Sequence, residues 1–122
     1  MEFIDLSKQL VNIRSNIDKR IANVLNHGRF IMGPEVLELE KKLADYVGVK
    51  HCISCSSGTD ALVVSLMSKG IGSGDAVITT PFTYIATAEA IRLVGATPIF
   101  IDIDLETFNM DPSLIHQGID YA

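Results

Sequence analysis

In the second part of the chain, short apolar segments alternate with segments whose apolar residues recur every three or four positions. The apolar segments at about 51–55, 76–79 and 97–102 predict strands, and those at about 59–69 and 84–94 predict helices. Strands that alternate with helices at this spacing pair in parallel through right-handed crossovers. Their nearly continuous apolar character suits a sheet covered on both faces. The pattern therefore predicts an α/β fold with three layers, α/β/α, around a mostly parallel sheet.

Two amphipathic helices are predicted before this alternating part. Apolar residues recur at helical spacing over about 8–26, and Gly28 supplies the left-handed conformation that ends many helices. Pro34 suits the first position of a second helix, which runs to about Tyr46 and ends at Gly48. The fold is therefore expected to be preceded by two helices and the short linker that joins them.

The predicted elements suggest a division of the chain into two parts. Residues 1–33 are expected to form an N-terminal helix and linker, and residues 34–122 the first part of a large domain that is incomplete here. A last helix is expected to open with Asp111 as its cap and Pro112 at its first position. Because no stop signal follows that helix, we expect the sequence to be the front of a longer one.

Composition excludes several classes of protein. Apolar residues make up 48% of the 122 residues, which is enough for a buried core and argues against disorder. The net charge of −5 argues against nucleic acid or an anionic membrane as a partner. No apolar run approaches the ~20 residues of a membrane span, and the start lacks the regions of a signal peptide. A cytoplasmic protein is expected.

Cys52 and Cys55 form a C-x-x-C pair, with His51 beside them. A redox or metal role places such a pair at a helix start or on a tight knuckle, whereas this pair lies in or just past a predicted strand. No second cluster of metal-ligating residues follows. We interpret the two cysteines as small buried thiols and expect no metal site.

A turn of small residues, Ser56-Ser57-Gly58-Thr59, separates the first predicted strand from the helix after it. The first turn of a helix exposes unpaired N–H groups at the positive end of the helix dipole, so a phosphate could bind there. The alternative is an ordinary turn in which a threonine or an aspartate caps the helix. This run alone leaves both interpretations open.

Aromatic residues follow the second predicted strand, in the run Thr80-Pro81-Phe82-Thr83-Tyr84. Ligands of parallel sheets bind beyond the carboxyl ends of the strands, where these rings could stack on a flat heterocycle. Together with the anion-binding turn, they suggest a phosphorylated aromatic cofactor. The glycine fingerprints of dinucleotide and nucleoside triphosphate sites are absent, which disfavours a Rossmann-like nucleotide binder.

Five motifs in register resemble the start of the DegT/DnrJ/StrS-type sugar aminotransferases. They are Gly28–Val36, Ser57–Leu62, Gly74–Ile78, Pro81–Thr87 and Gly95–Asp104. The resemblance covers nearly the whole chain, and it implies the large domain of the type I aspartate-aminotransferase fold with pyridoxal 5'-phosphate (PLP) as cofactor. The opening Glu2-Phe3-Ile4-Asp5-Leu6, with His27-Gly28 and Cys52–Cys55, is most similar to the aminotransferases that act on a UDP-linked 3-oxo-glucuronic acid sugar.

The resemblance also implies which residues hold the cofactor. Gly58, Thr59 and Asp60 would bind the phosphate through their backbone and through the Thr59 hydroxyl. Tyr84 would stack on the pyridine ring, with Phe82 as the alternative for that role. Without the resemblance, the interpretation of Tyr84 is core packing at a helix start.

Substrate-binding residues follow from the same resemblance. The linker residues Arg29, Phe30 and Ile31 would lie near the nucleotide sugar, unless they form a plain connection between helices. Asp102 and Asp104 would shape the end of the third strand, and we assign them no chemistry.

The implied reaction moves an amino group from an amino acid, with glutamate as the expected donor, onto a nucleotide-linked keto sugar for cell-surface polysaccharides. Family members are homodimers, so a homodimer is expected. Transamination needs a lysine that bonds to the cofactor and a carboxylate that holds its ring nitrogen protonated. The family carries both beyond the position of residue 122, so no catalytic residue is expected here. The alternatives are a sugar dehydratase of this fold and a non-catalytic binding remnant.

Overall fold

The computed structural model describes residues 4–121, so Glu2, Phe3 and Ala122 lie outside the described residues. Its contacts divide the chain into two units that meet between Ser54 and Cys55, and each unit is described by itself. The sequence predicted a different boundary, between residues 33 and 34, where the first part of a large domain would begin. That boundary stays a prediction. No helix in the described part of the chain is long and apolar enough to cross a membrane.

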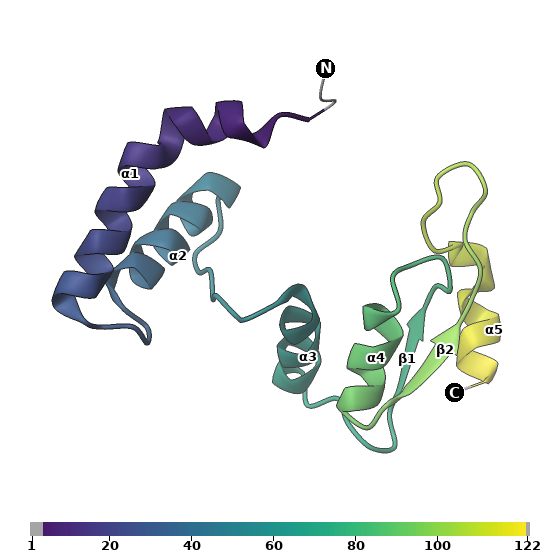
Figure 1. Ribbon diagram of the computed structural model, residues 1–122. Coiled ribbons are helices and arrows are strands. Elements are labelled where there is room, and N and C mark those ends of the chain that lie inside the picture. The colour runs from purple at the N-terminus through teal and green to yellow at the C-terminus, as the bar shows by residue number, and fades with distance from the viewer. Residues whose placement is uncertain (1–3, 122) are drawn as a thin grey trace. The chain divides into compact units, whose positions relative to one another are not determined.

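The first unit contains two helices, α1 (Leu6–His27) and α2 (Pro34–Val47), as Figure 1 shows. The sequence predicted their ends closely. Gly28 and Gly48 both adopt the left-handed conformation at the helix C-termini, and Pro34 occupies the first turn of α2. These signals act within a few residues along the chain, so they do not depend on the rest of the fold.

Charged side chains join α1 to α2. The Arg20 guanidinium donates two hydrogen bonds of 2.9 Å to the Glu38 carboxylate, which also accepts from Lys42. These two cations lower the pKa of Glu38 to about 2. The predicted apolar face of α1 has no comparable partner: no residue of α1 is buried, and Leu10, Ile13, Ile17 and Ile21 are all exposed.

The second unit contains the sheet. Its two strands pair in parallel, with Ala76 opposite Thr97 and Thr79 opposite Phe100, which confirms two predicted strands and their direction. The elements in chain order are α3 (Gly58–Ser68), β1 (Ala76–Thr79), α4 (Ala86–Leu93), β2 (Thr97–Phe100), the 3₁₀ turn η1 (Pro112–Leu114) and α5 (Ile115–Asp120). The predicted cap of the last helical segment is also present, because the Asp111 carboxylate accepts from the Ser113 N–H.

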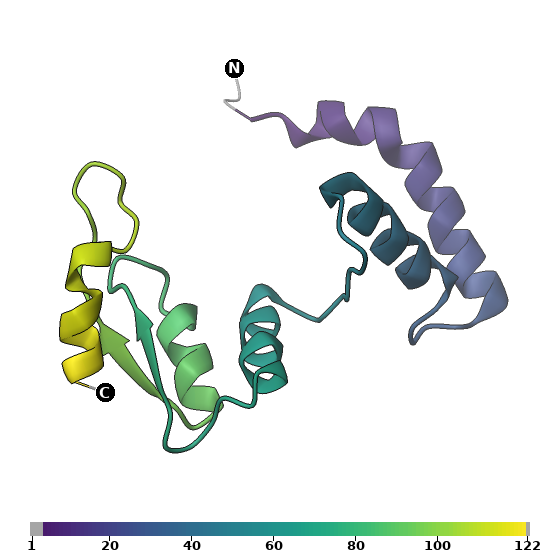
Figure 2. The same cartoon turned by 180° about the vertical axis from the view of Figure 1, so that it is seen from behind.

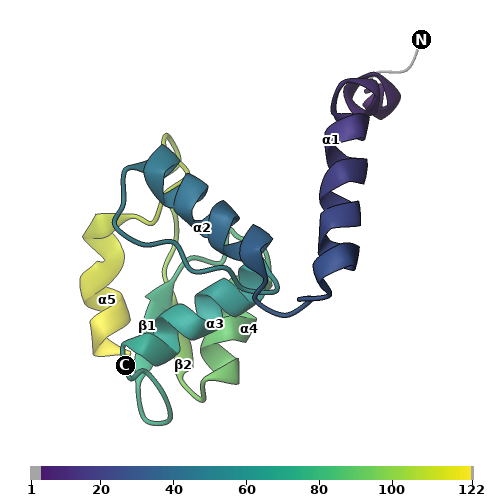
Figure 3. The same cartoon turned by 90° about the vertical axis from the view of Figure 1, so that its left-hand side faces the viewer.

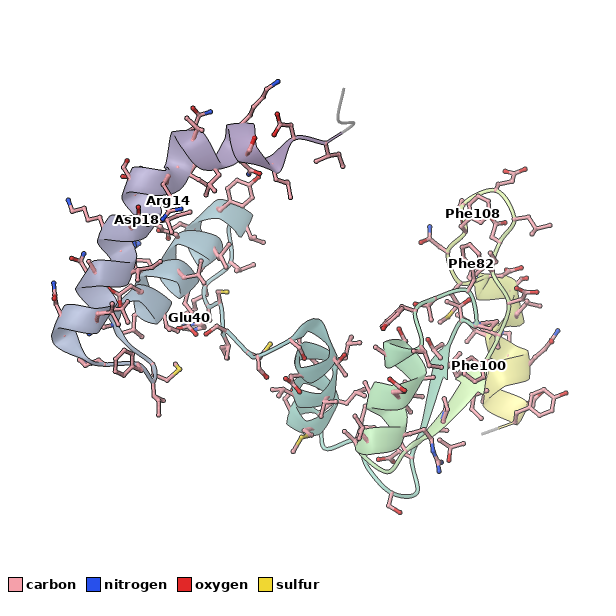
Figure 4. All side chains as sticks on the ribbon, in the orientation of Figure 1. Arg14, Asp18, Glu40, Phe82, Phe100 and Phe108 are labelled. Atoms are coloured by element: carbon pink, nitrogen blue, oxygen red, sulfur yellow. The ribbon has the colours of Figure 1, made fainter. Side chains whose placement is uncertain are left out.

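The first predicted strand, at about 51–55, is wrong: this segment is irregular, and the sheet of the described residues consists of β1 and β2. A strand needs a neighbouring backbone to bond with, and here the Ser54 N–H donates to the Glu40 carboxylate of α2 instead, at 2.8 Å (Figure 4). The interpretation of the cysteines fails for the same reason. Without a buried strand, Cys52 is half-buried and Cys55 is exposed.

The second unit has the predicted three layers in small form. Helix α4 packs on one face of the sheet with α3 against it, and α5 packs on the other face (Figures 1 and 3). The core is small and tight, with Ala90, Ile91 and Ala96 at most 3% exposed. The carboxyl ends of both strands and the N-termini of α3 and α4 lie at one end of the unit, as Figures 1 and 2 show.

Helix α5 approaches the sheet through a glycine. A Cβ atom placed on Gly118 would lie 3.0 Å from the Ile78 side chain of β1 and 3.1 Å from Ile101. A larger residue must therefore push α5 away from the sheet or distort both isoleucines.

We expect Gly118→Val to lower the free energy of unfolding by about 1–3 kcal/mol, because overpacking a tight interface forces side chains from their rotamers. The matched control is Gln117→Val, which places the same residue at an exposed position of α5. Urea unfolding compares the two variants. Equal midpoints for both would show that Gly118 is not a close-contact residue.

Candidate functional site

Three segments lie at the predicted ligand position, beyond the carboxyl ends of the strands. They are the start of α3, the loop of residues 80–85 after β1, and the loop of residues 101–111 after β2. All three belong to the second unit, so the parallel topology of that unit brings them to one end.

The start of α3 has the helix cap of one interpretation and the open donors of the other, but the capping residue is Ser57 and not the expected threonine or aspartate. Ser57 has an extended backbone and caps the helix, its hydroxyl accepting from the Asp60 N–H at 3.1 Å. The N–H groups of Gly58 and Thr59 have no acceptor among residues 4–121. The space beside Gly58 is open, since a Cβ there would meet nothing within 4 Å. The turn is therefore capped, and it still offers two N–H donors to an anion.

Asp60 plays a different part from its two neighbours. Its N–H is taken by Ser57, and its carboxylate accepts hydrogen bonds from the hydroxyls of Ser56 and Ser57. The hydrogen bonds from those hydroxyls lower the pKa of the Asp60 carboxyl, and the bond from Ser56 has the larger effect. Of the three predicted phosphate-binding amides, only those of Gly58 and Thr59 are unoccupied in the described residues.

The loop after β1 presents one free aromatic ring and one engaged ring. Tyr84 precedes α4 and is 79% exposed, so the alternative of core packing at a helix start is wrong. The Phe82 ring instead lies against Phe108 from the loop after β2, with ring centroids 5.7 Å apart (Figure 4). Within the described chain, Phe82 and Phe108 are the aromatic pair, and Tyr84 has no aromatic neighbour.

The loop after β2 is folded by the aspartates that the sequence singled out. The Asp104 carboxylate accepts from the N–H groups of Thr107 and Glu106. Its hydrogen bonds with Thr107, and to a smaller extent that with Glu106, lower the pKa of Asp104. Ile103 and Met110 form an antiparallel bridge, in which the Asp104 N–H donates to the Asn109 carbonyl and the Asp111 N–H donates to the Asp102 carbonyl, so the loop closes like a small hairpin. Asp104 thus shapes the strand end as predicted. Phe108 was missed, because its partner is distant in sequence and no local pattern marks the contact.

The linker predicted to approach the substrate belongs to the first unit. Arg29, Phe30 and Ile31 are exposed, with Ile31 at 89%. Gly33 ends the linker by a close approach, since a Cβ there would lie 2.4 Å from the Arg29 carbonyl oxygen. The linker therefore has a defined turn and outward-facing side chains. Its position relative to the loops of the second unit stays a prediction.

These observations define a class of protein. A parallel sheet between helices, an open helix start and an exposed ring at one end of the strands fit the fold of a type I PLP enzyme. The chain belongs to the DegT/DnrJ/EryC1/StrS aminotransferase family, whose sequence profile matches residues 11–122. Solved relatives confirm the predicted fold: an aminotransferase of this family from Brucella abortus superposes with a TM-score of 0.89 at 47% identity, over 99% of this chain and 32% of its own.

Two further relatives carry more specific descriptions. The UDP-2-acetamido-2-deoxy-3-oxo-D-glucuronate aminotransferase of Pseudomonas aeruginosa is 55% identical over 98% of this chain and 33% of its own length. A protein from Streptococcus pneumoniae described as a sugar aminotransferase, solved in its PLP form, superposes with a TM-score of 0.77 at 36% identity, over 82% of this chain and 25% of its own. The chain thus spans about a third of the length of the curated relatives it matches.

Proposed function

We propose that the protein is a PLP-dependent aminotransferase that moves an amino group from glutamate onto a nucleotide-linked keto sugar, for the sugars of cell-surface glycans. The observation that carries the proposal is an open helix start and an exposed aromatic ring at one end of a parallel sheet, in a chain of this family. The 55% identity to an aminotransferase of a UDP-linked 3-oxo sugar supports that substrate class.

The cofactor phosphate is proposed to bind at the start of α3. The N–H groups of Gly58 and Thr59 donate to it, and the half-buried Thr59 adds a hydroxyl that has no partner among the described residues. Asp60 contributes indirectly, because its carboxylate holds the hydroxyls of Ser56 and Ser57 beside the turn. The acidic chain repels anions overall, so these local donors must supply the attraction.

Tyr84 is proposed to stack on the pyridine ring of the cofactor. Its ring is exposed and free, whereas the Phe82 ring already lies against Phe108, which favours Tyr84 over Phe82 for this role. When bound, PLP supplies the electron sink for amino-group transfer. The residues of this chain are proposed to bind and orient it, and no catalytic lysine or carboxylate is assigned among them.

The remaining elements of the proposal concern partners. Arg29, Phe30 and Ile31 are proposed to line the nucleotide-sugar site, and their exposed side chains suit such contacts. We further propose a cytoplasmic homodimer. The exposed apolar face of α1, formed by Leu10, Ile13, Ile17 and Ile21, supports burial against further protein.

We expect the protein, as its natural host makes it, to convert a UDP-linked 3-oxo sugar into the amino sugar when PLP and glutamate are supplied. Mass spectrometry of the nucleotide sugar and of the 2-oxoglutarate formed measures the reaction. Aspartate and alanine serve as comparison donors. Loss of the keto sugar by dehydration, without transfer of nitrogen, would replace the proposed activity with that of a dehydratase.

Thr59→Val should weaken PLP affinity by at least about tenfold, because it removes a hydrogen bond to a charged phosphate. Titration of the apo protein measures the dissociation constant for PLP and for pyridoxal, which lacks the phosphate. Pyridoxal binding should be unchanged. The matched control is Thr97→Val at the exposed opposite end of β2. Equal losses for the two variants would remove Thr59 from the phosphate site.

Tyr84→Leu should weaken PLP affinity about fivefold, the loss expected when an aromatic stacking partner becomes aliphatic. Tyr84→Phe should retain the affinity, because it keeps the ring. Tyr121→Leu is the control, since Tyr121 is 80% exposed and lies at the C-terminal end of α5. A loss with Tyr84→Phe as large as with Tyr84→Leu would assign the contribution to the hydroxyl instead of the ring.

A further inference from the structure

The rings of Phe82 and Phe108 join the two loops at the carboxyl end of the sheet. Their planes are inclined by 31° at a centroid distance of 5.7 Å, within the range of favourable aromatic pairs (Figure 4). Both residues remain more than half exposed, Phe82 at 62% and Phe108 at 58%. The pair therefore buries little surface, and it links the loop after β1 to the loop after β2.

Phe108 is held in place by its own loop. Its φ of 57° lies in the left-handed region, which an aromatic residue rarely adopts. The Phe108 N–H donates to the Asp104 carbonyl at 2.8 Å, and the Asp104 N–H donates to the Asn109 carbonyl at 2.9 Å. Hydrogen bonds on both sides thus hold an unfavourable backbone conformation, and the ring is directed at Phe82.

Phe82 is connected to Tyr84 by a tightly turned backbone. The Phe82 N–H donates to the Thr80 hydroxyl at 3.1 Å, and the Thr83 N–H donates to the Pro81 carbonyl at 2.9 Å. The Thr83 hydroxyl lies 3.2 Å from that of Thr87 in α4. Only Thr83 separates Phe82 from Tyr84 in this turn, so a shift of Phe82 would displace the backbone that carries Tyr84.

We propose that Phe108 is a positioning residue, whose ring fixes Phe82 and so sets the orientation in which Tyr84 meets the cofactor. Phe108 itself does not touch the cofactor. The inference rests on the proposed stacking role of Tyr84. It adds a contact between two loops to a site that is otherwise formed by the start of α3 and the loop after β1.

The test uses Phe108→Asn in the protein as its host makes it. Asparagine tolerates the left-handed backbone and removes the ring. PLP affinity should fall about fivefold, and the circular-dichroism band of bound PLP should change in amplitude, since it reports ring orientation. Phe108→Tyr should restore both. The control is Leu105→Asn, at an 83% exposed position of the same loop. If Phe108→Asn does not fold, Phe82→Leu removes the same ring pair.

The same substitution in a Tyr84→Leu protein distinguishes a failure of this inference from a failure of the proposed function. In a Tyr84→Leu protein, adding Phe108→Asn should weaken PLP affinity no further, because Phe108 acts through Tyr84. A further fivefold loss there would overturn the inference and leave the role of Tyr84 intact. An effect of Tyr84→Leu with none of Phe108→Asn would do the same. If Tyr84→Leu has no effect, the stacking role fails, and the inference fails with it.

Discussion

The parallel pairing of β1 with β2 is the constraint on which the candidate site depends. Parallel neighbours need a crossover, here α4, and that crossover returns the chain to the opposite end of the sheet. Strand ends and helix starts must then gather at one end of the unit. Gly118 lets α5 close the other face against Ile78, so the sheet that sets this arrangement is covered on both sides. The site is thus a consequence of topology before any side chain is considered.

Sequence reasoning succeeded where the signal was local. Gly28, Pro34 and Gly48 define helix ends through their own backbone preferences, and the structure shows each in the expected role. The strand at about 51–55 failed because an apolar run cannot reveal whether a neighbouring strand exists to pair with it. In the described residues that backbone is bonded to Glu40, a side chain no periodicity would select.

Part of the candidate site could likewise be predicted from local patterns in the sequence. A turn of small residues before a helix and a pair of rings after a strand are readable patterns, and the structure shows both at the carboxyl end of the sheet. The sequence could not say which ring is free, because that depends on Phe108, far away in the chain. The sequence also could not say which N–H groups of the turn are used by the cap and which stay open, since that depends on the side-chain hydrogen bonds of Ser57.

Those hydrogen bonds narrow the chemistry of the turn further. The Ser57 hydroxyl both accepts from the Asp60 N–H and donates to the Asp60 carboxylate, and the Ser56 hydroxyl donates to the same carboxylate. Neither serine can donate to an anion without giving up a bond to a negative charge. At the start of α3 the uncommitted hydroxyl is that of Thr59. A phosphate placed at this turn would therefore depend on one threonine and two amides, acting against the nearby charge of Asp60.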